Sequence, residues 1–149
     1  MPREPALATL RELARCFQAF ESHSAAHIRS LGLTPPQFDI VATLGNTAGM
    51  SFKELGEKTL ITKGTLTGVV DRLEGRGVVR RVGSAADRRS TRVELTDVGT
   101  ALFDEVFPGV VVRTKQVFAV LGDTERLALE ASLRRLREAF ESFPQAGHK

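Results

Sequence analysis

The amino-acid sequence predicts a mainly α-helical fold that carries one small β-hairpin. Apolar residues recur at spacings of three and four along most of the 149 residues, which is the period of an amphipathic helix. Residues 78–95 depart from this period, because two short runs there alternate apolar and polar residues on either side of a Gly- and Ser-containing stretch. Capping residues stand where the helical segments should begin, and glycines stand near their expected ends.

A long first helix is expected over residues 5–31, with Gly32 as its stop. Thr34 to Gln37 predicts the start of a second helix, because Thr34 can cap it, proline is tolerated in the first turn and Gln37 completes a capping box. The apolar stripe of the first helix is narrow and includes two polar residues: Leu10, Leu13, Phe17, Phe20, Ser24, His27 and Leu31. The second helix carries Phe38, Ile40, Val41 and Leu44.

Two short helices joined by a tight turn are expected next. Ser51 and Glu54 form a second capping box for a helix that ends at about Lys58, and Thr62 can cap a further helix over residues 63–75. The inward face of this further helix is expected to be Leu66, Val69, Val70 and Leu73. The pair is typical of a helix-turn-helix motif.

The alternating region that follows predicts a wing. Residues 78–82 and 92–95 are expected to be its two strands, and residues 83–91 form a small, polar and positive loop between them. A hairpin directly after a helix-turn-helix indicates a winged helix.

The C-terminal third is expected to be two helices. Thr96 can cap a helix that runs to Leu121 and that Pro108-Gly109 should bend or briefly interrupt, and Asp123 can cap the last helix. Leu129, Leu133, Leu136, Phe140 and Phe143 keep a strict a/d spacing in that last helix.

Terminal helices this apolar need a cover, and the same helices of a second chain would supply it. The prediction is therefore a winged helix-turn-helix flanked by N- and C-terminal dimerisation helices. Residues 1–34 would be the N-terminal arm, 35–107 the winged lobe (with the start of the long helix from residue 96), and 108–149 the C-terminal dimerisation helices.

Positive charge is concentrated in one stretch of the chain. Between Arg72 and Arg92 there are seven arginines against only Glu74 and Asp87, whereas the net charge of the whole chain is +3. Such a concentration indicates a polyanionic partner, and its alternative is a solvated basic surface.

The remaining composition excludes several classes of protein. A single cysteine excludes an internal disulfide framework and a cysteine zinc cluster, and the chain has no tyrosine. No apolar run reaches the roughly 20 residues that cross a bilayer, and the N-terminus lacks a signal peptide's hydrophobic core. We therefore expect a cytoplasmic protein.

The order of these elements resembles the MarR family of bacterial transcription regulators. The resemblance is carried by LTPPQFDIVATL at 33–44, by ELGEKTLITKGTLTGVVDRLEGRGVVRR at 54–81 and by DRRSTRVELTDVG at 87–99. Its most specific part is the succession of DRLExxG, a basic strand, DRR and LTxxG. The resemblance implies a winged-helix homodimer that binds DNA.

In a winged helix of this kind the helix over 63–75 would lie in the major groove. Thr62, Lys63, Thr65 and Thr67 are the candidates for base-edge or phosphate contacts, and Arg72 and Arg76 are the candidates for backbone phosphates. Gly64 and Gly68 weaken a helix by about 1 kcal/mol each relative to alanine. Either they admit close approach of the duplex, or they pack against a neighbouring helix.

The wing loop offers Arg88 and Arg89 to DNA. The resemblance assigns Arg89 to the minor groove, where narrow A·T-rich segments attract a guanidinium. Asp87 would orient the neighbouring arginines. The alternative is a loop that is only a solvated hairpin tip.

Cys16 lies within or beside the stripe of the first helix. One branch of the resembling family senses organic peroxides with a cysteine in this helix, but there tyrosines support the thiolate, and Glu12 would disfavour a thiolate here. A buried structural cysteine is therefore the preferred interpretation, and a redox role for Cys16 is the alternative.

His23 and His27 are four residues apart, a spacing that can place two imidazoles on one metal. A third ligand is hard to find, so we expect no metal and no cofactor. The resemblance also implies a cleft for aromatic acids, with Thr67 and Arg81 at positions that contact the carboxylate and His23 and His27 as further lining. Thr67 and Arg81 could equally serve DNA or a salt bridge.

No motif indicates an enzyme. The sequence predicts a homodimeric transcription regulator that binds a pseudo-palindromic operator, as a repressor released by a small aromatic or anionic ligand. Two alternatives are a redox-responsive regulator acting through Cys16 and a winged helix used for protein–protein contact.

Overall fold

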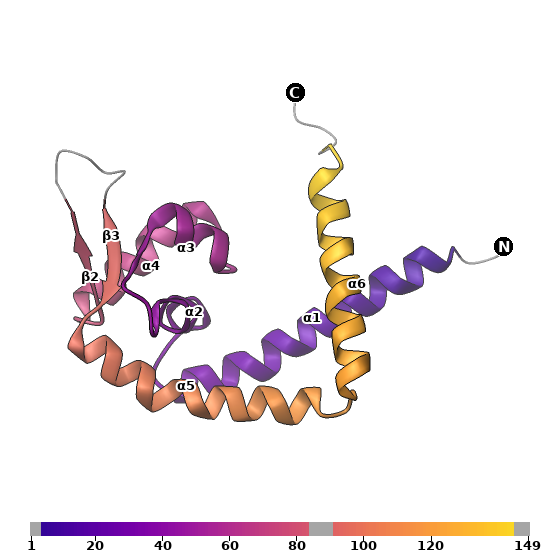
Figure 1. Ribbon diagram of the computed structural model, residues 1–149, viewed down its shortest axis with the longest axis horizontal. Helices are drawn as coiled ribbons and strands as arrows, with labels where there is room; N and C mark the ends of the chain where they lie inside the picture. The colour runs from indigo at the N-terminus through magenta and orange to yellow at the C-terminus, as the bar shows by residue number, and fades with distance from the viewer. Residues whose placement is uncertain (1–3, 84–90, 145–149) are drawn as a thin grey trace. The chain divides into compact units, whose positions relative to one another are not determined.

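The structure is a computed structural model that describes residues 4–83 and 91–144. It has the predicted architecture, a mainly helical chain with one small antiparallel sheet (Figure 1). The elements in chain order are α1 (Pro5–Ser30), α2 (Pro35–Leu44), β1 (Met50–Ser51), α3 (Phe52–Lys58), α4 (Lys63–Gly75), β2 (Val79–Val82), β3 (Arg92–Leu95), α5 (Asp97–Phe118) and α6 (Asp123–Ser142). In the described part of the chain, no helix combines the length and the apolar character needed to cross a membrane.

The chain divides into two compact units, Met1–Phe107 and Pro108–Lys149. The division falls inside α5, which continues through Pro108 without the interruption that the sequence had left open. A proline inside a helix removes one backbone hydrogen bond and crowds the preceding turn. Gly109 and the valines at 110–112 that follow it are weak helix formers, so local helix propensity does not explain why α5 continues.

The two capping boxes predicted from the sequence are confirmed. The Thr34 hydroxyl accepts from the Gln37 N–H at 3.3 Å while the Gln37 side chain accepts from the Thr34 N–H at 3.1 Å. Ser51 and Glu54 make the same reciprocal pair at 3.1 and 3.3 Å. The Glu54 carboxylate accepts from the Ser51 N–H and also from the Ser51 hydroxyl at 3.2 Å, and these two hydrogen bonds lower the pKa of Glu54.

Two other predicted caps differ in detail. Thr62 is the N-cap residue of α4, but its hydroxyl lies 3.0 Å from the Thr65 hydroxyl and makes no cap hydrogen bond to the backbone. Asp123 does not cap α6, because Gly122 holds the N-cap position and Asp123 is the first helical residue. Gly122 has no side chain that could cap the helix, and the Glu125 carboxylate instead accepts from the Gly122 N–H at 3.5 Å.

The sheet has three strands in the order β1-β3-β2, all antiparallel. The hairpin of β2 and β3 was predicted, with Val79 opposite Leu95 and Val82 opposite Arg92. The pairing of β1 with β3, through Met50 and Val93, was missed. A two-residue strand is too short to show an alternating pattern in the sequence.

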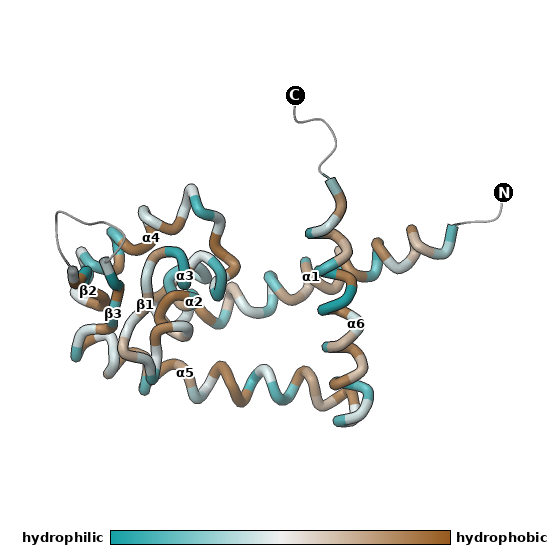
Figure 2. The backbone as a smooth tube through the Cα atoms, turned by 45° about the horizontal axis from the view of Figure 1, so that its top comes forward, coloured by the Kyte–Doolittle hydropathy of each residue, from teal (hydrophilic) through white to brown (hydrophobic). Residues whose placement is uncertain are grey.

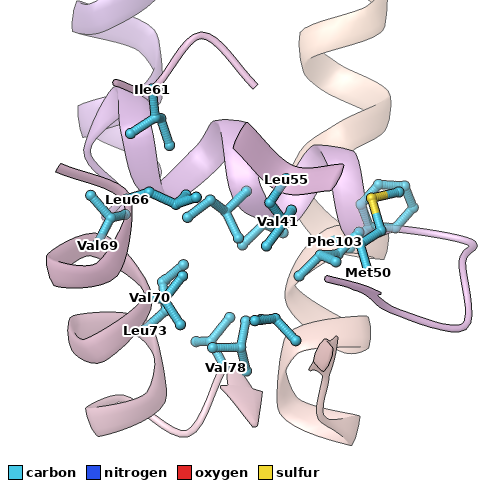
Figure 3. Close-up of a cluster of buried hydrophobic side chains, with 14 residues drawn as sticks. Val41, Met50, Leu55, Ile61, Leu66, Val69, Val70, Leu73, Val78 and Phe103 are labelled. Carbon is cyan, nitrogen blue, oxygen red and sulfur yellow. The ribbon is translucent and has the colours of Figure 1, made fainter. Parts of the chain in front are cut away.

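The core of the first unit gathers between α2, α3, α4, α5 and the sheet (Figure 3). The predicted inward face of α4 is confirmed, since Leu66, Val69, Val70 and Leu73 are all buried. They pack with the other members of one cluster: Ile40, Val41, Leu44, Met50, Leu55, Ile61, Val78, Val79, Val93 and Phe103. Burying each large aliphatic side chain stabilises the fold by about 1.5–3 kcal/mol, so this cluster fixes α4 on the body of the domain.

The LTxxG segment joins α5 to the sheet. The Val78 carbonyl accepts from the Thr96 N–H at 3.1 Å, and the Thr96 hydroxyl donates to the neighbouring Gly77 carbonyl. The same hydroxyl accepts from the Gly99 N–H at 3.1 Å, so Thr96 caps α5 as the sequence predicts. A Cβ at Gly99 would lie only 2.0 Å from the Val78 carbonyl oxygen. Glycine is therefore required at this position.

The terminal helices expose large apolar side chains. On α1, Phe17 and Phe20 are each 51% exposed, and on α6 no residue is buried. Figure 2 shows hydrophobic and hydrophilic residues alternating along both helices. Cys16 is also exposed, so the preferred interpretation of a buried cysteine is wrong for the chain as described. The stripe beside it is itself uncovered within this chain, which explains the difference.

Candidate nucleic-acid interface

The helix α4 presents one face to the core and the opposite face to solvent. Residues advance by about 100° around a helix, so Gly64 and Gly68 lie opposite the buried Leu66 and Leu73. Lys63, Thr65, Thr67 and Arg72 flank this outer line, and all of them are exposed. The predicted base-reading residues thus share one solvent-facing surface, which we call the α4 face (residues 62–65, 67, 68 and 72).

The glycines of the α4 face have no packing role among the described residues. A Cβ built at Gly64 or at Gly68 has no neighbouring atom within 4 Å. The structure therefore does not support the alternative in which these glycines allow a neighbouring helix of the chain to pack closely. They leave a strip of exposed helix backbone instead.

The turn before α4 is tied to α2. The Asp39 carboxylate accepts from the Leu60 N–H at 2.8 Å, 21 residues along the chain. Burial raises the pKa of Asp39, and this hydrogen bond, which favours the ionised form, offsets the shift only in part. Keeping Asp39 ionised therefore costs the folded state some free energy, while its carboxylate fixes the turn before α4 through the hydrogen bond to Leu60.

This cost predicts the behaviour of Asp39→Asn, whose amide oxygen can still accept from Leu60. We expect its melting temperature at pH 7 to equal or exceed that of the wild type. The pKa of Asp39 is raised in the folded state, so the wild type recovers stability as the pH falls through this raised value and the folded carboxylate takes up a proton. Thermal unfolding between pH 7 and pH 4 should therefore show the difference narrowing as the pH falls. Asp39→Ala removes the acceptor and should lose about 1 kcal/mol; equal stability of the Ala and Asn variants would contradict the role of this bond.

Arg81 is held by the protein itself. Its guanidinium binds Asp71 and, at 2.7 Å, Glu74, both on α4, and it lies 5.5 Å from the centre of the Phe52 ring. The hydrogen bond with Asp71 raises the pKa of Arg81, which stays fully charged. Of the two roles left open for Arg81 besides effector binding, the structure contains the salt bridge, which joins β2 to α4.

Three further arginines of the basic stretch also have intramolecular partners. Arg80 pairs with Glu94 at 2.6 Å across the hairpin. Arg92 donates to the Gly49 carbonyl at 2.6 Å. Arg76 donates to the Gly32 carbonyl at 3.2 Å and to the Gln37 side chain at 3.3 Å, which ties the end of α4 to the α1–α2 connection. The positive stretch therefore serves the fold as well as any partner.

Arg72 differs from these four. It is exposed on the α4 face, and its guanidinium makes no hydrogen bond or ion pair with any of residues 4–83 or 91–144. Asp87, Arg88 and Arg89 of the predicted wing loop lie outside the described residues.

The helix α3 adds exposed cations that the sequence analysis did not single out. Lys53 and Lys58 are both exposed, and the chain continues from Lys58 through the turn to Lys63 at the start of α4. The first helix of a helix-turn-helix commonly crosses the phosphate backbone, so lysines on it were a usable signal. Leu60, in the turn between the two helices, is 80% exposed and was also missed.

The predicted effector residues are not brought together by direct contacts. Arg81 binds Asp71 and Glu74 and, among the described residues, not Thr67. Thr67 is exposed on α4, and His23 is exposed on α1. A hollow of about 250 Å³ in this domain is lined by Leu44, Asn46, Thr47, Arg80 and Glu94 among others, and by none of these candidates. In the described part of the chain no three His, Cys, Asp or Glu residues are grouped to hold a metal.

Comparisons with known proteins agree with this geometry. A family model described as the MarR family matches residues 31–90. The chain is 31% identical over 123 residues to the uncharacterized HTH-type transcriptional regulator YsmB of Bacillus subtilis (strain 168), covering 77% of this chain and 84% of that protein. It is 29% identical over 124 residues to the HTH-type transcriptional regulator MhqR of the same organism, with 83% and 86% covered.

A solved structure extends the likeness to most of the chain. It is that of Bordetella bronchiseptica BpsR, from a study of how 6-hydroxynicotinic acid regulates its DNA binding. The two structures match with a TM-score of 0.77 and 29% identity, over 87% of this chain and 98% of that chain. With the winged-helix architecture, the matching motifs and these relatives taken together, the chain belongs to the MarR family of helix-turn-helix transcription regulators.

Proposed function

We propose that this regulator binds a pseudo-palindromic operator as a homodimer and represses transcription until a small aromatic or anionic ligand releases it. The observation that carries the proposal is the α4 face. The opposite side of α4 is buried in the core, and the face itself has two unobstructed glycines between exposed Thr, Lys and Arg side chains. Such a surface fits the major groove, where donors and acceptors on base edges need close approach. The cytoplasm, which holds bacterial DNA, is its proposed place of action.

The dimer is proposed from the apolar faces of the terminal helices. Phe17 and Phe20 on α1, and Leu133, Leu136 and Phe140 on α6, are all more than one third exposed in the single chain. A second copy would bury them. In this proposal residues 1–34 and 108–149 are dimerisation segments and residues 35–107 form the DNA-binding lobe. Half-sites would then lie about one helical turn, roughly 34–36 Å, apart.

The proposed DNA contacts divide by chemistry. Thr62, Lys63, Thr65 and Thr67 would reach base edges or nearby phosphates from the first turns of α4. Arg72, which has no partner among the described residues, would bind a backbone phosphate. Arg76 is the weaker candidate for a phosphate, because its guanidinium already donates to Gly32 and Gln37. Arg88 and Arg89 would bind DNA from the wing, oriented by Asp87.

The proposed ligand class is supported by BpsR, whose DNA binding is regulated by an aromatic acid. His23, His27, Thr67 and Arg81 are the proposed pocket residues. A ligand carboxylate that bound Arg81 would compete with Asp71 and Glu74, and so would loosen the link between β2 and α4. Ligand binding would thereby change how firmly α4, the proposed DNA-reading helix, is held against the sheet.

The second candidate is a redox-responsive regulator that acts through Cys16, whose thiol is exposed in the single chain. Cys16→Ser should abolish release of DNA by organic peroxide if this candidate is right. If the variant and the wild type respond alike, Cys16 is not the sensor.

The test of the main proposal is DNA binding at several salt concentrations. The probe is the promoter region beside the protein's own gene, with excess random-sequence DNA as competitor, and a selection from random DNA supplies the operator if that region fails. We expect specific retention of a dimer and a steep fall of affinity with salt, because each neutralised phosphate releases counterions. Failure of both probes would favour a winged helix that binds a protein partner.

Arg72→Ala sharpens this test. With two copies of Arg72 in a dimer, the slope of log affinity against log salt should become shallower by about two. Arg135→Ala is the matched control, because it removes the same charge from an exposed position on α6 outside the a/d stripe. Equal slopes for the two variants would remove Arg72 from the phosphate contacts. Arg89→Ala tests the wing in the same assay, and unchanged DNA binding by that variant would count against the wing assignment.

A further inference from the structure

Leu60 is an exposed apolar side chain at the entrance to α4. It is 80% exposed, whereas its neighbours Thr59 and Ile61 are 7% and 9% exposed. A single exposed leucine is ordinary on a protein surface. The position of Leu60 is unusual, because Leu60 lies two residues before the N-cap of α4, the helix that carries the candidate interface.

The backbone of this turn is held on both sides of Leu60. The Leu60 N–H donates to the Asp39 carboxylate at 2.8 Å. The Thr59 hydroxyl donates to the Leu55 carbonyl at 2.6 Å, and Ile61 is anchored in the core (Figure 3). The Leu60 side chain is therefore directed outward by a fixed turn.

The surroundings of Leu60 are polar and basic. Thr62 and Lys63 follow it, both exposed, and Gly64 offers no side chain. Lys58 precedes it at the end of α3 and is also exposed. A partner that covers this region must therefore combine negative charge with a small apolar group. A DNA major groove does so, since phosphates line it and the 5-methyl group of thymine is the apolar group on its base edges.

We propose that Leu60 contacts a thymine methyl group in the major groove and so specifies an A·T pair at one position of each half-site. This inference rests on the proposed function, in which α4 lies in that groove. One methyl group removed from water corresponds to about a fourfold change in affinity. The two half-sites of a dimer's operator together correspond to about fifteenfold.

The test replaces thymine by deoxyuridine, which removes the methyl group and keeps the base pair. Symmetric pairs of thymines in the selected operator are replaced one position at a time, and the dissociation constant is measured by fluorescence anisotropy at fixed salt. We expect the affinity of the wild type to fall about fifteenfold when deoxyuridine replaces thymine at one symmetric pair of positions. Leu60→Ala should bind the thymine operator more weakly than the wild type, and it should bind the thymine and uracil duplexes equally at that position.

Thr65→Ser is the matched control, because it removes a methyl group from the same face but keeps the hydroxyl. It should retain the uracil sensitivity at the Leu60 position. Uracil sensitivity that persists in Leu60→Ala, or that disappears in Thr65→Ser instead, overturns the assignment while DNA binding itself stands. A wild type that binds no duplex better than random competitor overturns the proposed function and this inference together.

A protein cover for Leu60 would show itself differently. Exposed positions of this kind tolerate substitution within about 0.5 kcal/mol. Leu60→Ala should therefore keep the melting temperature and the dimer mass of the wild type. A clear loss of either would mean that Leu60 is buried against protein in the assembly, which also overturns the thymine contact.

Discussion

Gly99→Ala is expected to destabilise the winged domain by about 3 kcal/mol or more. An added Cβ would lie 2.0 Å from the Val78 carbonyl oxygen and 3.1 Å from the Leu95 side chain. The Val78 carbonyl cannot move away without weakening the hydrogen bond that it accepts from the Thr96 N–H. Forcing atoms into such a contact shifts backbone and costs more than an ordinary surface substitution. The melting temperature should fall by about 10 °C or more.

Gly109→Ala is the matched control for this prediction. It lies in the same helix, α5, and a Cβ there has no neighbour within 4 Å. It should leave the protein unchanged or stabilise it by up to about 1 kcal/mol, because alanine favours a helix. Circular dichroism and urea unfolding measure both variants. A Gly99→Ala protein that melts within about 2 °C of the wild type would contradict the close approach of α5 to Val78.

The contrast between these two glycines shows where sequence reasoning stops. The LTxxG segment was recognised by resemblance, and Thr96 was predicted as a cap from local chemistry alone. The need for glycine at residue 99 comes from Val78, a residue 21 positions earlier, and only the folded chain brings the two together. Local signals such as the Thr34–Gln37 box were predicted correctly because both partners lie within one turn.

Contacts between residues far apart in the sequence also limited the prediction for the basic stretch (residues 72–92). Its charge count predicted a polyanionic partner, but the count cannot say which arginines are already paired. Arg81 binds Asp71 and Glu74, and Arg80 binds Glu94, so neither is free to serve DNA without giving up a partner. The exposed Leu60 was missed for a related reason, because a leucine between helices gives no sign of whether it faces the core. The helices themselves were predictable, since their period and caps are written in consecutive residues.

Gly64→Ala and Gly68→Ala are expected to change stability and DNA binding in opposite directions. Each should stabilise the isolated protein by about 0.5–1 kcal/mol, because alanine favours a helix and the Cβ meets nothing within 4 Å. Each should also weaken operator binding by about tenfold or more, since the new methyl group would stand between the exposed helix backbone and the groove. Thermal unfolding and anisotropy on the same preparations measure both effects.

Gly75→Ala is the control that distinguishes an effect on DNA contact from an effect on helix stability. Gly75 ends α4 on the same side as Gly64 and Gly68, and its Cβ is equally unobstructed, but it lies about 16 Å from Gly64 along the helix axis. It should not lower the stability and should leave DNA binding within about threefold, because the first turns of a recognition helix are the ones that approach the bases. If all three variants bind the operator like the wild type, the α4 face does not enter the groove. If the first two lose stability, a partner chain packs on these glycines and the bare strip is a protein interface. Loss of affinity together with a gain in stability is the combination that only close approach to DNA explains.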